Sequence, residues 1–408
     1  MTKFLILVLV LNCTKINLSL NSSYKEFEIE KEIIRIIKKD DLEEFEQKIG
    51  DDINKPLDID KSCALHYCAE FNASKITEFL LRNDKIDVNI QAIQTLKGRK
   101  MKKASPLHIA CYQGHKNLVK MFIDKGADTN AEACGGYTPQ HYAAISGNRD
   151  CLELLVNEKN INIREKENGG SLIYYAALVG NEELVKWLKE KGANIDLYDY
   201  KGYTAAHRAI IEECPKALGI LIRNGANMSL KGEFGVTSLY LAAKRNSFNN
   251  NVKEIIELLL NNGCEIDEKS QNSWTPLSAA IINNNFSLVE FLLKNGANIK
   301  EDFDFNITTA INKGNKRIVL LFLKNLKSSE INIQSENLKF ETLIDAMKEL
   351  NLDINKTQFK NGLNVLQAIV ESNGTKKELL YATERSGASI RFLKGNQLLL
   401  YNKIFSTN

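Results

Sequence analysis

Three side chains able to bind a metal or act as nucleophiles lie close together in one short stretch. His108, Cys111 and His115 stand in "SPLHIACYQGH", residues 105–115, at offsets of zero, three and seven. On an α-helix these offsets share one face, and imidazole and thiolate groups are good ligands for transition metals. A metal site normally occurs once in a chain, whereas a structural pattern recurs.

The stretch does recur, and its period is constant. Motifs with the same layout begin at residues 105, 138, 171, 204 and 237, each 33 residues after the one before. They read "SPLHIAC", "TPQHYAA", "SLIYYAA", "TAAHRAI" and "TSLYLAA", and further copies are "CALHYCA" at 63–69 and "TPLSAAI" at 275–281. A fixed period of this length indicates structural repeats that stack on one another.

These seven units resemble the ankyrin-repeat family, whose template is a "TPLHxAA" motif followed by "GAD". The resemblance covers most of the chain from about residue 27. It implies an all-α fold, an α-solenoid of stacked helix–turn–helix units connected by finger loops that contain β-turns. It also implies that the protein binds another protein through the tips of these fingers and the exposed face of the first helix of each unit.

The residue types at the expected helix ends agree with this architecture. A side chain able to cap the first helix precedes it at Ser105, Thr138, Thr204, Thr237 and Thr275. Glycine stands where the second helix would end in the left-handed conformation, at Gly126, Gly192, Gly225, Gly263 and Gly296. Each unit is therefore predicted to hold two helices with defined ends.

The repeats predict the organisation of the chain. Residues 27–62 are predicted to be an N-terminal capping repeat, 63–306 the seven clear units, and 307–408 degenerate C-terminal repeats and a cap. Nine surplus residues fall at "QTLKGRKMKKA" (94–104) and five at "NSFNNN" (246–251). The basic part of the first insertion is interpreted as a solvated loop, with contact to an anionic partner, or a nuclear address, as the alternative.

The N-terminus has a different character from the repeats. Lys3 precedes the apolar run "FLILVLVL" (Phe4–Leu11), which is too short to span a bilayer but suits the core of a secretory signal peptide. Residues 1–22 are therefore predicted to be a targeting segment, cleaved after residue 12, 19 or 22. Lipidation of Cys13 would instead anchor the protein to a membrane. We expect a secreted or membrane-anchored protein; a buried N-terminal helix or strand in a cytoplasmic protein is the alternative.

Comparison of the repeats assigns residues 105–115, with His108 and Cys111, to the structural scaffold. Histidine at the fourth motif position, in His66, His108, His141 and His207, is replaced by tyrosine or serine in other units. The position therefore needs a polar group that bonds the turn, and Cys111 stands where other units have alanine. We expect no metal, no cofactor and free cysteines. No catalytic motif is present, so the chain is predicted not to be an enzyme.

The predicted partner is a protein, and the protein itself is expected to be a monomer. Lys and Arg total 54 against 51 Asp and Glu, and this near balance argues against nucleic acid. The candidate contact residues are of types that dominate binding hot spots: Tyr112, Tyr137, Tyr200, Tyr203, Phe234, Arg245 and Trp274. The alternatives are a secreted or surface-anchored effector of a parasite or bacterium acting on a host protein, and enzyme activity in the divergent C-terminal region.

Overall fold

A computed structural model describes residues 28–49, 52–96, 99–245, 247–325 and 340–350, together with residues 352, 367, 382, 383, 388, 393 and 397. The chain divides into two compact units. Unit 1 comprises Met1–Ala205 with Arg223–Ala226, and unit 2 comprises Ala206–Ile222 with Asn227–Asn408. The predicted targeting segment 1–22 lies outside the described residues, as does nearly all of the chain after 350.

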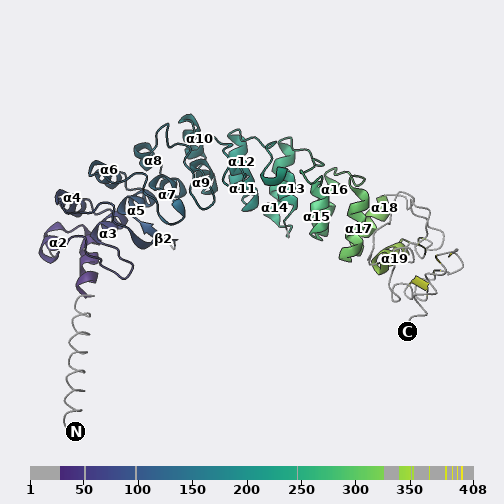
Figure 1. Ribbon diagram of the computed structural model, residues 1–408, viewed down its shortest axis with the longest axis horizontal. Coiled ribbons are helices and arrows are strands. Elements are labelled where there is room, and N and C mark those ends of the chain that lie inside the picture. The colour runs from purple at the N-terminus through teal and green to yellow at the C-terminus, as the bar shows by residue number, and fades with distance from the viewer. Residues whose placement is uncertain are drawn as a thin grey trace, which may run out of the picture. The chain divides into compact units, whose positions relative to one another are not determined.

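Unit 1 is a row of helix pairs, each followed by a finger loop (Figure 1). A helix over 28–39 precedes α2 (Leu42–Lys48). The following pairs are α3 (Ala64–Phe71) with α4 (Ser74–Arg82), α5 (Pro106–Gln113) with α6 (Lys116–Asp124), α7 (Pro139–Ser146) with α8 (Arg149–Leu155), and α9 (Leu172–Leu178) with α10 (Glu182–Glu190). The first helices α3, α5, α7 and α9 contact one another in turn, as do α4, α6 and α8. This confirms the predicted stack of helix pairs.

Unit 2 repeats the same arrangement. Its helices are α11 (Ala205–Ile211), α12 (Pro215–Arg223), α13 (Ser238–Ala243), α14 (Asn250–Asn261), α15 (Pro276–Ile282), α16 (Phe286–Lys294), α17 (Phe303–Lys313), α18 (Lys316–Asn325) and α19 (Phe340–Glu349). The first helices α13, α15 and α17 stack in sequence order, and α19 packs against α17 and α18. None of the described helices is long and apolar enough to cross a membrane.

The core lies between the first and second helices of each pair. In α6 the apolar residues Leu118, Val119 and Phe122 are fully buried on one face, while the opposite face is polar. Because α5 and its neighbours pack on both sides, small residues such as Ala110 and Cys111 are buried there and let the helices approach closely. The alternation of amphipathic and almost wholly buried helices follows from this layering.

The predicted helix ends are confirmed where the structure describes them. Thr237 and Thr275 accept a hydrogen bond from the third backbone amide of the helix that follows them. Gly126 and Gly192 have φ values of 89° and 95°. A Cβ at either glycine would meet no atom within 4 Å, so the backbone conformation, and not a lack of space, requires glycine there.

The basic insertion, expected to be a solvated loop, has regular secondary structure. It forms an antiparallel hairpin of β1 (Ala92–Leu96) and β2 (Arg99–Ala104), with Ala92 opposite Ala104. Both of these alanines and Met101 are buried at its base, which anchors the hairpin to the unit. Strand pairing satisfies backbone groups that an open loop would leave to water.

Candidate binding surface

His108 uses both of its ring nitrogens to hold the scaffold together. Nδ1 accepts a hydrogen bond from the Ser105 amide at 3.1 Å and lies 2.8 Å from the Ser105 hydroxyl. Nε2 lies 3.0 Å and 3.2 Å from the carbonyl oxygens of Ala131 and Tyr137 in the following finger. Since Nδ1 accepts from an amide, Nε2 carries the proton and donates to these carbonyls. Neither nitrogen is left to bind a metal.

His66 repeats this arrangement in full, and His141 repeats its Nδ1 half by accepting a hydrogen bond from the Thr138 amide at 3.2 Å. His66 Nδ1 accepts from the Cys63 amide at 3.1 Å, and its Nε2 faces the Ala104 carbonyl at 3.2 Å. Burial lowers the pKa of His66, His108 and His141 to about 4, so the three rings are neutral at neutral pH.

The other two candidate ligands in residues 105–115, Cys111 and His115, have separate environments. Cys111 is fully buried, and burial raises the pKa of its thiol well above the usual range. The Nε2 of His115 lies 3.3 Å from the carbonyl of Glu70 on α3. No group of three or more His, Cys, Asp or Glu side chains in the described part of the chain could hold a metal ion.

Hydrogen bonds within the turns make the finger tips rigid. The Asp199 amide donates to the Tyr203 carbonyl at 2.8 Å, and the Asp199 carboxylate accepts from the amides of Lys201 and Tyr203, both at 2.8 Å. In the preceding finger the buried carboxylate of Glu165 accepts from three backbone amides, including that of Gly170 at 3.0 Å. Side chains on such turns are presented in a defined position.

Two of the predicted contact residues project into solvent. Tyr200 is 56% exposed and Phe234 is 71% exposed. Tyr200 is held from one side, because the Arg164 guanidinium lies 4.6 Å from the centre of its ring and also donates to the Tyr198 carbonyl at 2.7 Å. Phe234, in the short helix η2 (Glu233–Gly235), has a φ of 56°. A positive φ is uncommon for a bulky residue.

Tyr112 and Tyr137 are half-buried and form part of a tyrosine cluster with Tyr142 and Tyr175. The ring of Tyr137 lies 5.8 Å from that of Tyr175 in the next repeat, and the Tyr175 hydroxyl donates to the Tyr137 hydroxyl at 3.1 Å. The Tyr112 ring meets the edge of Tyr142 at 6.2 Å. These contacts connect consecutive repeats, so Tyr137 packs between neighbouring units and does not project freely into solvent.

The remaining candidates are also half-buried. Tyr203 follows the Asp199 turn, and Arg245 forms an ion pair with Glu213 at 3.1 Å in unit 2. Trp274 stacks on Phe305, with ring centres 5.7 Å apart and planes 18° from parallel.

Trp274 and Phe305 both line a cavity of about 340 Å³. Sequence reasoning missed Phe305, which is 39% exposed, because it lies in a unit that lacks the "TPLH" motif. It likewise missed Arg164, whose sequence context carries no sign of its contact with Tyr200.

The family model described as ankyrin repeats (3 copies) matches residues 90–167, 158–232, 213–303 and 239–337. The chain belongs to the ankyrin-repeat family. Ankyrin-repeat domains are typically protein-binding scaffolds, and no catalytic domain is identified within the matched region.

Similar ankyrin-repeat proteins come from a bacterium, a virus and a mammal. A putative ankyrin repeat protein of Rickettsia bellii is 30% identical over 38% of this chain and 43% of its own length. An ankyrin repeat protein of Variola virus is 28% identical over 48% of this chain and 37% of its own. The mouse B-cell lymphoma 3 protein homolog is 29% identical over 36% of this chain and 33% of its own. The chain thus spans less than half the length of these relatives.

Among solved structures, the ankyrin repeat domain of Bcl-3 is similar to this chain. The TM-score is 0.44 at 20% sequence identity, with 56% of this chain and 97% of that domain covered.

Proposed function

We propose that this ankyrin-repeat protein is a non-catalytic scaffold that binds a protein partner through its finger tips and first helices. The observation that carries the proposal is the exposure of Tyr200 and Phe234 on hydrogen-bonded turns. Solvent-exposed aromatic side chains on rigid supports lose little entropy on binding and are common anchors in protein interfaces. Membership of a family of typically protein-binding scaffolds supports the same conclusion.

The tyrosine cluster and the exposed tips are assigned different roles. Tyr137 contributes chiefly to the packing of consecutive repeats, because it contacts Tyr142 and Tyr175. Tyr200 contacts the Arg164 guanidinium and stays 56% exposed. Tyr200 and Phe234 are therefore the first residues to test as partner contacts.

The test compares partner capture by the parent protein, the Tyr200→Ala/Phe234→Ala variant and a Leu154→Ala control. Leu154 is an exposed apolar residue on α8, away from the fingers and first helices. Proteins captured from the native source of this protein are identified and quantified by mass spectrometry. Each aromatic anchor is expected to be worth about 2 kcal/mol, so the double variant should lose its partner while the control retains it.

Melting temperatures decide how a loss of capture is interpreted. The double variant should melt within a few degrees of the parent, because both side chains project into solvent. Undiminished capture by the double variant would place the partner site elsewhere. The alternative of enzyme activity in the C-terminal region concerns residues that lie largely outside those the structure describes.

A further inference from the structure

The cavity of unit 2 that Trp274 and Phe305 line has an acidic wall. Its volume is about 340 Å³, and its lining comes from two segments, the turn before α15 and the first turn of α17 with its cap residue. Of the described residues that line it, Asp302 and Asp304 carry a negative charge and none is basic. The charge of the lining therefore favours a cation over an anion.

Asp302 is only partly neutralised by its own neighbours. It is the cap residue of α17, yet its side chain accepts no hydrogen bond from the first turn of that helix. Its Oδ1 accepts one from the Lys269 ammonium at 2.9 Å, and its buried Oδ2 has no hydrogen-bond partner in the described part of the chain. The same ammonium lies 2.7 Å from the Glu301 carboxylate. One cation is thus shared by two carboxylates, which leaves an excess of negative charge beside the cavity.

Phe305 gives the cavity an exposed aromatic wall in a fixed position. Its ring is 39% exposed and stacks on the half-buried indole of Trp274, with 18° between the planes. The backbone of Trp274 is held in turn, because its carbonyl accepts hydrogen bonds from the Ser270 amide at 3.0 Å and the Ser270 hydroxyl at 3.2 Å. A ring held in this way loses little conformational entropy when a ligand packs against it.

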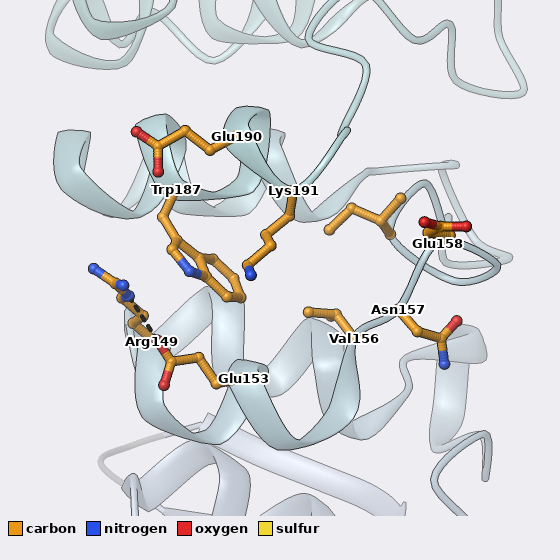
Figure 2. Close-up of a pocket in the computed structure, with 9 residues that line it drawn as sticks. Arg149, Glu153, Val156, Asn157, Glu158, Trp187, Glu190 and Lys191 are labelled. Carbon is orange, nitrogen blue, oxygen red and sulfur yellow. Dashed lines mark hydrogen bonds and ion pairs between the residues drawn. The ribbon is translucent and has the colours of Figure 1, made fainter.

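Elsewhere in this protein the cations that lie over aromatic rings come from the chain itself. Figure 2 shows such a case in a pocket of about 640 Å³ between α8 and α10, where the Trp187 indole reaches down between Arg149 and Lys191. These cations lie 5.5 Å and 5.9 Å from the centre of a Trp187 ring. In the part of the chain that the structure describes, neither Trp274 nor Phe305 has such a cation. Carboxylates border these two rings, and their charge would attract a cation from outside.

We propose that this cavity binds the guanidinium of an arginine side chain of the partner protein. The guanidinium would lie against the ring of Phe305, and the carboxylates of Asp302 and Asp304 would balance its charge. Arginine suits the cavity better than lysine, because a guanidinium is planar, stacks on aromatic rings and is more weakly hydrated than an ammonium. Since the arginine belongs to a protein partner, its binding here rests on the proposed function and adds one contact to those at Tyr200 and Phe234.

The test follows Trp274 by fluorine NMR in the full chain labelled with fluorotryptophan. The chain has two tryptophans, so a spectrum of the Trp187→Phe variant identifies the resonance of Trp274. The probe is the end-blocked peptide Gly-Ser-Arg-Ser-Gly. Its two controls carry citrulline, which has the shape of arginine without the charge, or glutamate at the central position.

The arginine peptide should shift the Trp274 resonance in a saturable way and leave the Trp187 resonance unchanged. It should bind at least about fivefold more tightly than the citrulline peptide, and the glutamate peptide should cause no shift, because the attraction depends on positive charge. Phe305→Leu keeps an apolar side chain but removes the ring, and it should weaken arginine binding about threefold.

Neutralising the acidic wall should have a larger effect. Asp302→Asn/Asp304→Asn should weaken arginine binding about fivefold, as expected for two partly exposed charge pairs, and asparagine tolerates the positive φ of residue 302. Asp304 is exposed, so Asp304→Asn alone should keep the fold and still weaken binding about twofold. The matched variant Asp124→Asn/Asp150→Asn removes two charges from exposed positions of unit 1 and should leave binding unchanged.

Four results would refute an arginine site in this cavity. They are equal binding of the arginine and citrulline peptides, no shift of Trp274 at millimolar arginine peptide, equal shifts of both tryptophan resonances, and equal weakening by the two aspartate double variants. Tyr200→Ala/Phe234→Ala should leave peptide binding unchanged, whereas its capture of the partner tests the proposed function. The arginine site and the proposed function can therefore fail separately.

Discussion

Mild acidification should destabilise this protein through its buried histidines. Burial lowers the pKa of His66, His108 and His141 from 6.5 to about 4. Between these values the unfolded chain binds more protons than the folded one, so stability falls as the pH falls from about 6.5 towards 4. An imidazole that is protonated at Nδ1 can no longer accept a hydrogen bond there. In His108, protonation would break the hydrogen bond from the Ser105 amide.

The magnitude follows from the two pKa values. A histidine with a pKa of about 6.5 when unfolded and about 4 when folded loses about 1 kcal/mol of stability between about pH 7 and about pH 5.5. Three such residues give a combined loss of about 3 to 4 kcal/mol if the repeats that hold them unfold together. The measurement is urea unfolding followed by circular dichroism at both pH values.

The control is His66→Gln/His108→Gln/His141→Gln, because a glutamine amide can both accept and donate but does not titrate. Its overall stability is expected to be lower than that of the parent, and its stability should change little between the two pH values. The paired carboxylates do not confound this comparison, because the parent and the variant both carry them. Hydrogen bonds from Arg223 to Glu182 and from Asn249 to Glu213 lower the pKa of both glutamates, so the stability that they contribute is lost only below the pH range compared. An equal pH dependence in the parent and the variant would refute the assignment to histidine.

Three further outcomes are expected. Leu239→Ala and Leu277→Ala each empty a buried position and should cost about 2–5 kcal/mol in urea unfolding; a cost below about half a kcal/mol would mean that the helix faces are wrongly assigned. Tyr175→Phe removes the hydroxyl that donates to the Tyr137 hydroxyl at 3.1 Å and lies 3.4 Å from the Glu165 carboxylate, and it should cost about 1 kcal/mol; an unchanged midpoint would show that the tyrosine cluster is held by ring packing alone. Mass spectrometry of protein from its native host should find the N-terminus after residue 12, 19 or 22, and an intact Met1 would contradict export.

Much of the fold is readable from sequence because its determinants are local. A Thr or Ser cap, a glycine in the left-handed conformation and apolar residues at helical spacing act within a few residues of one another. The period of 33 then repeats each local solution, so a weak signal in one unit is supported by its neighbours. The same comparison between units assigns His108 to the scaffold, in agreement with its hydrogen bonds to Ser105 and to the following finger.

The features that sequence reasoning missed arise where the repeat pattern is interrupted. The hairpin of β1 and β2 requires pairing across an insertion whose composition favours a solvated loop. The pocket beside Trp187 arises from the early end of α8, and Lys159 in place of glycine is the signal that could have indicated it. The stacking of Phe305 on Trp274 joins two units, one of which has no recognisable motif.

The solvent exposure of the predicted aromatic contact residues in the finger loops depends on how many residues separate each of them from the helix cap that follows. Tyr137, Tyr203 and Trp274 stand immediately before a capping threonine, and all three are half-buried. At that position the side chain is turned towards neighbouring residues, as the contact of Tyr137 with Tyr175 shows. Tyr200 and Phe234 stand four and three residues before the cap, and they are the most exposed of the predicted contact residues. Aromatic residues alone therefore do not identify a binding surface in this protein, because position within the finger decides whether the ring stabilises the stack or stays available to a partner.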